Sequence, residues 1–275
     1  MASGSYKIGI IGGAGWLGSA IARSLIRVGV ADKSEIAVSS RSPRPLNSEG
    51  IYQTADNGEL ARIADVVIIS VRPEDAHLVD VDLQGKLLIS VMAGVPSELL
   101  STRHRTRRVV RALPNAAADV GLSYTPWFAS SDTSLEDRRL VGTIFDACGT
   151  QDELTREEDI DFLTGLTGTG PAYPALLAVA MYNSARSHGI NEDVAVRAVN
   201  GMLIGAGGLL QDRPVHPQNT VSAFVDYKGV TAAGIEAMQR RGFIEAVDEG
   251  IKAALEKTQA ISRSIGHQGR WKTTT

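Results

Sequence analysis

A glycine-rich segment near the amino terminus constrains the fold of this chain more than any other feature. Residues 7–11 (KIGII) form a short apolar run, and the sequence Gly-Ala-Gly-Trp-Leu-Gly follows at residues 13–18. From Ser19 to Val28 apolar residues recur at helical spacing until Gly29 ends the pattern. A strand that enters a helix through such glycines predicts a loop that binds phosphate groups.

Each position in this G-x-G-x-x-G pattern has a physical role. Gly13 allows a tight turn, Gly15 allows the backbone to approach a pyrophosphate, and Gly18 allows the helix to pack closely on the sheet. The helix that begins here offers unpaired N–H groups and a partial positive charge to an anion. We therefore expect a dinucleotide to bind at Gly13, Gly15, Trp16, Leu17 and Gly18, and a plain glycine-rich turn is the alternative.

Further apolar runs alternate with helix-compatible segments through the first half of the chain. Residues 65–71 (DVVIISV) have no polar residue between Asp65 and Ser70, as expected for a strand buried on both faces of a sheet. The alternation predicts an α/β domain, a Rossmann-like doubly wound parallel sheet. The expected strands are residues 7–11, 35–40, 65–71, 86–91, 107–112 and 123–129.

The second half of the chain has long helical periodicity and almost no strand signal. It predicts helices over residues 171–188, 191–211 and 231–263. We expect residues 1–154 to form the dinucleotide-binding domain, residues 155–266 an all-α domain, and residues 267–275 a tail. Glycines among large apolar residues at 201–210 predict either a close helix–helix approach, within the domain or across a dimer, or a simple buried core helix.

The cofactor can be predicted from the end of the second strand. An NAD site places an acidic residue there to bind the ribose 2′-hydroxyl, whereas this chain has Ser39-Ser40-Arg41-Ser42. Hydroxyl groups at Ser40 and a guanidinium at Arg41 suit a 2′-phosphate. We therefore expect NADP(H) as the cofactor, and NAD(H) is the alternative. The competing interpretation is that Arg41 is an ordinary loop arginine.

Composition narrows the remaining classes. The net charge of −3 argues against binding to nucleic acid or to an acidic membrane, because both attract proteins with an excess of positive charge. Cys148 is the sole cysteine, so no disulfide forms within the chain, and the histidines show no metal-ligand spacing. No apolar run approaches a membrane span, and we expect a cytoplasmic protein without a signal segment. The densest basic run, which we expect to be mostly a solvated loop, is Arg103, Arg105, Arg107, Arg108 and Arg111.

Several segments resemble a known family in the same order and at similar separations, over roughly residues 7–262. The most specific is Leu-Thr-Gly-Thr-Gly-Pro-Ala-Tyr at residues 166–173, which is similar to L-S-G-S-G-P-A-Y in the pyrroline-5-carboxylate reductases. Residues 64–73 (ADVVIISVRP) resemble that family's A-D-V-V run, with arginine in place of lysine. The other matching segments are residues 39–42, 89–95 (ISVMAGV) and 111–115 (RALPN).

The resemblance implies a Rossmann domain followed by an all-helical domain that forms a homodimer or a higher oligomer of dimers. It also implies hydride transfer from NADPH to the carbon of a cyclic imine, giving proline, at a site between the nicotinamide and helical-domain residues of two subunits. Thr169 and Gly170 would offer N–H groups to the substrate carboxylate. The segments that would border the cofactor are Val71-Arg72-Pro73, Ala93-Gly94 and Pro114-Asn115.

One segment departs from the family pattern. The family has H-P-x-Q-L-[KR]-D-x-V-[TC]-S-P-G-G-T-T, whereas residues 226–228 of this chain are Asp-Tyr-Lys in place of S-P-G. In the family this loop binds the substrate carboxylate through backbone N–H groups, here those of Gly229 and Val230, and its threonine, here Thr231, lies beside the imine nitrogen. Lys228 is new; it would pair with the carboxylate or act as an acid, or else it points to solvent.

This departure leaves alternatives open. A reductase of a different imine on the same fold would explain it, and a non-catalytic NADPH-binding sensor is the alternative from another class. A β-hydroxyacid dehydrogenase needs a lysine followed four residues later by asparagine, and no lysine after residue 150 has one. A deazaflavin-dependent reductase shares the amino-terminal plan, but the segment at residues 169–171 argues against it.

Overall fold

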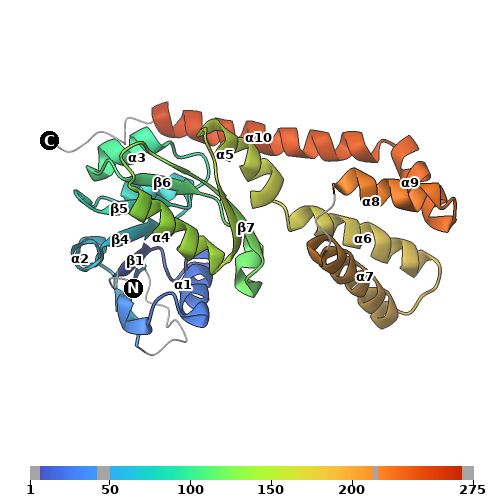
Figure 1. Ribbon diagram of the computed structural model, residues 1–275, viewed down its shortest axis with the longest axis horizontal. Coiled ribbons are helices and arrows are strands. Elements are labelled where there is room, and N and C mark those ends of the chain that lie inside the picture. Colours follow the sequence, from blue (N-terminus) through green and yellow to red (C-terminus); the bar gives the residue numbers. More distant parts are fainter. Residues whose placement is uncertain (1–6, 42–49, 213–215, 268–275) are drawn as a thin grey trace. The chain divides into compact units, whose positions relative to one another are not determined.

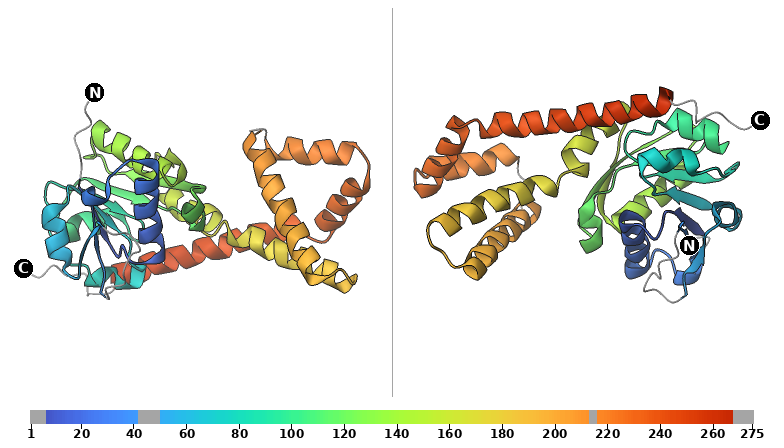
Figure 2. Two further views of the ribbon diagram at one scale, coloured as in Figure 1. Left: turned by 90° about the horizontal axis from the view of Figure 1, so that it is seen from below. Right: turned by 180° about the vertical axis from the view of Figure 1, so that it is seen from behind.

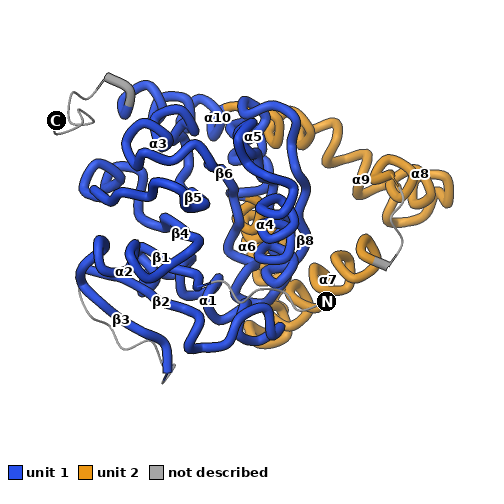
Figure 3. The backbone as a smooth tube through the Cα atoms, turned by 60° about the vertical axis from the view of Figure 1, so that its left-hand side comes forward, with its two compact units in different colours: residues 1–169, 253–275 blue, residues 170–252 orange. Residues whose placement is uncertain are grey.

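The computed structural model describes residues 7–41, 50–212 and 216–267. The chain divides into two compact units, which Figure 3 colours separately. The first contains residues 1–169 together with 253–275, and the second contains residues 170–252. The expected tail falls almost entirely at residues 268–275, outside the described residues.

The first unit is built on an eight-stranded sheet with the order β3-β2-β1-β4-β5-β6-β7-β8. Figure 1 labels β1, β4, β5, β6 and β7 of this sheet. Neighbouring strands are parallel except for the antiparallel pair β6 and β7. The chain thus winds outward in both directions from β1 and β4, which confirms the predicted doubly wound α/β fold. The strands are β1 Ile8–Ile11, β2 Ile36–Ser39, β3 Tyr52–Thr54, β4 Val66–Ile69, β5 Leu87–Ser90, β6 Val109–Ala112, β7 Ser123–Ala129 and β8 Gly149–Glu153.

All six predicted strands are present, and the sequence failed to indicate two more. The missing strands, β3 and β8, lie at the two edges of the sheet. Their residues are exposed or half-buried, whereas every residue of β1, β2, β4, β5 and β6 is buried. An edge strand needs no continuous apolar run, so hydrophobic patterning does not reveal it.

The central strands divide their side chains between two cores because successive residues of a strand face opposite sides of the sheet. Ile68 packs with α1 and α4 in one core, and its neighbour Ile69 packs with α2, α3 and the end of α10 in the other. Both side chains are fully buried. The helical elements are α1 Trp16–Val28, η1 Lys33–Glu35, α2 Asn57–Ile63, η2 Pro73–Leu78, α3 Ser97–His104, η3 Ala116–Val120, α4 Leu135–Asp146, α5 Glu158–Leu163 and η4, a π-helix, Thr164–Gly168.

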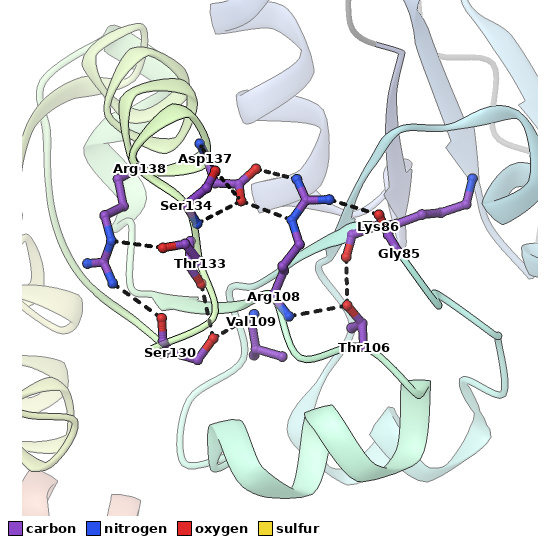
Figure 4. Close-up of polar contacts among 10 residues, drawn as sticks. All are labelled: Gly85, Lys86, Thr106, Arg108, Val109, Ser130, Thr133, Ser134, Asp137 and Arg138. Carbon is purple, nitrogen blue, oxygen red and sulfur yellow. Dashed lines mark hydrogen bonds and ion pairs between the residues drawn. The ribbon is translucent and has the colours of Figure 1, made fainter.

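The arginine run around the start of β6 is only in part the solvated loop that its sequence predicts. The side chains of Arg105 and Arg107 are 61% and 81% exposed, whereas Arg103, Arg108 and Arg111 bond to other parts of the first unit. Arg108 donates from Nε to Asp137 at 2.9 Å and from Nη1 to the Gly85 carbonyl at 2.8 Å (Figure 4). Asp137 also forms the capping box of α4 with Ser134, so one carboxylate joins the helix start to β6. Burial acts to raise the pKa of Asp137, but the bonds from Arg108 and Ser134 outweigh it and hold that pKa below its usual value.

Arg111 is the strongest exception to that expectation. Its side chain is only 3% exposed, and its guanidinium pairs with Glu157 and Asp161, each at 2.8 Å. Burial acts to raise the pKa of Glu157, but the bonds from Ser97 and Arg111 lower it overall. A buried guanidinium needs such partners, and these tie β6 to the start of α5.

The second unit consists of helices in its described residues (Figure 2). The prediction of one long helix over residues 231–263 is wrong in one respect, because the helix is interrupted at Gly242, which has a φ of +82°. A glycine in this left-handed conformation ends a helix at little steric cost. The helices are α6 Ala172–Ser187, α7 Glu192–Asp212, α8 Pro217–Asp226, α9 Val230–Arg240 and α10 Phe243–His267, the last of which continues into the first unit.

Helix α7 is almost entirely exposed in the single chain, with Ala195 and Val199 as its buried side chains. A Cβ added at Gly201, Gly205 or Gly208 would meet no described atom within 4 Å. Among the described residues, these glycines therefore make no close helix contact within the single chain, and α7 is not a buried core helix there. By length and composition, residues 192–211 would also suffice to cross a membrane, which is weak support for a span.

Candidate functional site

The predicted phosphate loop lies between β1 and α1, with Gly12 at its sharpest point. Gly12 has a φ of +80°, and its N–H donates to the Ser39 carbonyl at 2.9 Å. The left-handed conformation thus falls at Gly12, one residue before the expected pattern, while a Cβ at Gly13 would lie 2.7 Å from the Val38 side chain. A Cβ at Gly18 would lie 2.8 Å from the Gly12 carbonyl oxygen, so the close approach of helix and loop requires glycine there.

Helix α1 begins at Trp16 with Gly15 as its N-cap, and no described side chain caps it. The first N–H groups of a helix have no partner within the helix. They are therefore directed, with the positive end of the helix dipole, toward the loop where a diphosphate would bind. Gly13, Trp16, Leu17 and Gly18 form this loop and the first turn of the helix.

An open pocket of about 550 Å³ adjoins the loop. It lies where β1, β2 and β4 end, and β1 and β4 are the strands at which the winding direction of the sheet reverses. Ligands of doubly wound sheets bind at this position. The lining residues are Ile11, Gly12, Ala14, Gly15, Ser40, Arg41, Asn57, Ser70, Val71, Arg72, Asp75, Leu78 and Val79.

Five residues predicted to contact the cofactor line this pocket together: Gly15, Ser40, Arg41, Val71 and Arg72. They come from three segments that are far apart in the sequence, so their convergence supports a common ligand. Pro73 follows immediately as the first residue of η2.

Sequence reasoning missed three polar residues of the pocket, Asn57, Ser70 and Asp75. Asn57 begins α2, and the Ser39 hydroxyl donates to its side-chain oxygen at 2.7 Å. Asp75 lies in η2 and pairs with Arg41 across the pocket. Asp56 caps α2 in the structure, but no pattern in the sequence indicated that this helix begins beside the phosphate loop.

Trp16 is not among the residues that line the pocket, and its side chain contacts η3. Its indole N–H donates to the Asp119 carboxylate, which also pairs with Arg23 at 2.6 Å. The tryptophan is nevertheless 60% exposed, which leaves a broad aromatic surface beside the loop. The contact links the first turn of α1 to the segment that follows β6.

The remaining predicted cofactor residues follow β5 and β6, outside the lining of this pocket. Ala93 is half-buried, and Gly94 has a φ of +69°. A Cβ added at Gly94 would lie 2.9 Å from the Thr258 carbonyl oxygen, so a side chain does not fit there. Pro114 is buried, and Asn115 caps η3 by accepting from the Ala117 N–H at 2.9 Å. Because β4, β5 and β6 are parallel, these residues lie at the same edge of the sheet as the pocket.

The motif at residues 166–173 begins in the π-helix η4. The Thr169 N–H donates to the Thr164 carbonyl at 3.2 Å, and the Thr169 hydroxyl donates to the Gly165 carbonyl at 2.5 Å. The expectation of a free N–H at Thr169 is therefore wrong for this conformation. Gly170 follows η4 as the first residue of the second unit.

The departing segment forms a short turn between two helices rather than a long loop. Helix α8 extends to Asp226, and α9 begins at Val230 with Gly229 as its N-cap. Lys228 lies between them with a φ of +53°, and its N–H donates to the Val225 carbonyl at 3.0 Å. The side chains of Lys228 and Thr231 are exposed in the single chain. The N–H groups at the start of α9, the Thr231 hydroxyl and the Lys228 ammonium therefore belong to one short stretch of the chain.

Comparisons with known proteins match both units. The model of a family described as pyrroline-5-carboxylate reductase dimerisation matches residues 157–261. A second, described as NADP oxidoreductase coenzyme F420-dependent, matches residues 7–94. The second match ends within the sheet unit, whereas the helices match the reductase family, as the segment at residues 169–171 predicts.

Full-length relatives give the same assignment. A pyrroline-5-carboxylate reductase of Methanosarcina acetivorans is 30% identical over 272 residues, 94% of this chain and 99% of the relative. One from Synechocystis is 27% identical with the same coverage of this chain. A solved pyrroline-5-carboxylate reductase structure from Coxiella burnetii is 26% identical, with a TM-score of 0.85 over 94% of this chain and 99% of that one. This chain therefore belongs to the pyrroline-5-carboxylate reductase family.

Proposed function

We propose that the protein reduces pyrroline-5-carboxylate to L-proline with NADPH. The observation that carries this function is the end-to-end relationship to a reductase at 30% identity, which spans both the dinucleotide loop and the helical domain. In chemical terms, a hydride adds to the electrophilic carbon of the C=N bond and a proton is taken up at nitrogen. NADPH supplies the hydride when it is bound.

The residues of the pocket fit a phosphorylated dinucleotide. Gly18 leaves no room for a side chain beneath the loop, and the first turn of α1 directs N–H groups toward a diphosphate. Arg41 and Ser40 provide a cation and a hydroxyl for the 2′-phosphate, and no acidic residue follows β2 directly. We assign NADP(H) as the cofactor on these grounds, and residues 1–154 as the domain that binds it.

The turn between α8 and α9 is the proposed substrate element. The N–H groups of Gly229 and Val230 bind the substrate carboxylate, and Gly170 contributes a further backbone group. The Thr231 hydroxyl donates a hydrogen bond to the imine nitrogen or holds the water that protonates it. Lys228 supplies a positive charge for the carboxylate, since its backbone already lies in the same turn.

The second unit requires a partner to cover its apolar side chains. Leu176, Ile204, Leu209 and Leu210 are each more than half exposed in the single chain. Apolar patches of this kind mark subunit interfaces. We assign the exposed face of α7 to a homodimer, or an oligomer of dimers, in preference to a membrane span, and we assign the enzyme to the cytoplasm.

A second candidate is the reduction of another imine. The Asp226-Tyr227-Lys228 turn favours it, because this is where the sequence leaves the family pattern while the cofactor segments keep it. A larger imino acid would still use Thr231 and the same turn. A protein that binds NADPH without catalysis is the third outcome that an assay must separate.

The test is a panel of cyclic imines offered with NADPH and, separately, with NADH. We expect NADPH consumption with pyrroline-5-carboxylate, proline as the product, and slower turnover of pyrroline without the carboxylate. Faster consumption of a different imino acid would transfer the assignment to the second candidate. NADPH binding without turnover of any member of the panel would favour the non-catalytic protein.

A further inference from the structure

An acidic side chain, that of Asp75, lines the cofactor pocket although no acidic residue follows the second strand. Arg41 Nη2 is 2.7 Å from Asp75 Oδ2, and both residues line the pocket. Asp75 comes from η2, after β4, and is separated from Arg41 by 34 residues. The chain thus combines the basic residue typical of an NADP site with the carboxylate typical of an NAD site.

The two partners are held with different firmness. Asp75 lies in the first turn of η2, where Pro73 restricts the backbone and the Asp75 N–H donates to the Arg72 carbonyl at 2.9 Å. The Asp75 side chain is 26% exposed, whereas that of Arg41 is 77% exposed. The carboxylate is therefore the fixed partner, and the guanidinium is the one that can turn toward another anion.

A 2′-phosphate and Asp75 compete for the same cation. The phosphate carries between one and two negative charges, so it gains from Arg41 and loses from a nearby carboxylate. A free ribose 2′-hydroxyl carries no charge and can donate a hydrogen bond to that carboxylate, as it does to the acidic residue of an NAD site. The same side chain thus opposes one cofactor and favours the other.

We propose that Asp75 is a specificity-determining residue that reduces the preference of this enzyme for NADPH over NADH. It competes with the 2′-phosphate for Arg41 and accepts a hydrogen bond from the unmodified ribose of NADH. The consequence is an enzyme that retains use of NADH although Arg41 selects for the phosphate.

The test compares dissociation constants for NADPH and NADH in the full-length wild-type protein and in Asp75→Asn. Asparagine keeps the size of the side chain and removes its charge. We expect the ratio of the NADH constant to the NADPH constant to rise at least fivefold, mainly because NADPH binds more tightly. Asp75→Ser is a second variant in which the same direction is expected.

Glu74→Gln is the matched control. Glu74 is the neighbouring acid of η2 and does not line the pocket. Its contact with Arg72, at 4.0 Å between side chains that are 70% and 82% exposed, lies at the surface and contributes little. The Glu74→Gln substitution removes an equal charge from the same short helix. We therefore expect the ratio of the NADH constant to the NADPH constant to stay within twofold of wild type. An equal shift in Glu74→Gln would mean that the general field is responsible and would overturn the role of Asp75.

Weaker NADPH binding in Asp75→Asn would also overturn it, since Asp75 would then support Arg41 rather than compete for it. An unchanged ratio of the two dissociation constants would overturn it as well, since Asp75 would then have no effect on the choice of cofactor. Because the inference rests on the proposed function, the wild-type protein is also assayed with pyrroline-5-carboxylate. Turnover with NADPH together with an unchanged ratio overturns only the inference, whereas binding of neither nucleotide overturns both.

Discussion

The side-chain amide of Asn115 donates a hydrogen bond to the Thr167 carbonyl, with 3.0 Å between the two atoms. Asn115 ends the segment that follows β6, and Thr167 lies in the π-helix that opens the motif at residues 166–173. Two segments that each resemble the reductase family, and are 52 residues apart in sequence, are therefore bonded directly. The Asn115 side-chain oxygen also caps η3, so one side chain fixes three pieces of chain.

Asn115→Ala should lower both stability and turnover. It removes the cap and the bond to Thr167, which together contribute about 1–2 kcal/mol to the free energy of unfolding. Urea unfolding and steady-state kinetics measure the two effects. Asn115→Ser is the control, because serine keeps a capping oxygen and removes the amide donor without adding a charge beside the Thr167 carbonyl. If the serine variant loses as much as alanine, the bond to Thr167 accounts for the whole effect and the cap for none.

Thr231→Ala should slow turnover and leave the cofactor site intact. A hydroxyl that assists proton uptake contributes to the chemical step, so we expect kcat to fall by at least about tenfold. The dissociation constant for NADPH should not change. Thr231→Ser keeps the hydroxyl and should recover most of the rate, and a near wild-type rate in the alanine variant would remove Thr231 from the mechanism.

Lys228→Met should raise the KM for a carboxylated imine. The ammonium is exposed in the single chain, where an ion pair contributes little, so we expect a rise of about two- to fivefold. Lys228→Arg keeps the charge and should restore the KM. Pyrroline without a carboxylate should not distinguish the three proteins; if its KM rises equally in the methionine variant, the lysine shapes the turn instead of binding the carboxylate.

His104 should make the protein less stable on mild acidification. Its side chain is 1% exposed, and burial lowers its pKa below the ordinary value of about 6.5. As the pH falls through that value, the unfolded chain takes up a proton before the folded one, so stability is complete above it and is lost below it. Unfolding free energies measured between about pH 7.5 and 5.5 should show this loss.

Asp137 and Glu157, two carboxylates whose pKa values are lowered, affect stability only at lower pH. They are ionised in both states throughout that window, so their contribution is lost below about pH 4.5. His104→Gln should flatten the loss between the two limits.

The parts of the fold that could be predicted are those in which neighbouring residues carry the signal. The run DVVIISV predicts a strand buried on both faces, and β4 is buried at every residue. The glycines from Gly13 to Gly18 predict a phosphate loop because they are contiguous in sequence with the strand and the helix. Strand β8 has no such signal, since its edge position lets it carry polar residues.

The parts that could not be predicted depend on partners distant in sequence. Arg111 looks like any member of a basic run until Glu157 and Asp161, 46 and 50 residues later, are seen to surround it. Asp75 looks like a surface acid until β4 places it opposite Arg41. Periodicity and motifs describe neighbours along the chain, and they do not state which charges a sheet brings together.

The most direct test of the central claim is the rate of NADPH oxidation by the purified full-length protein with pyrroline-5-carboxylate, with proline measured as the product. We expect proline to form in a one-to-one ratio with the NADPH consumed, and the rate to fall by at least about tenfold in Thr231→Ala. NADPH that binds in the pocket but is not consumed with this imine, while another imine is reduced readily, would contradict the assigned substrate.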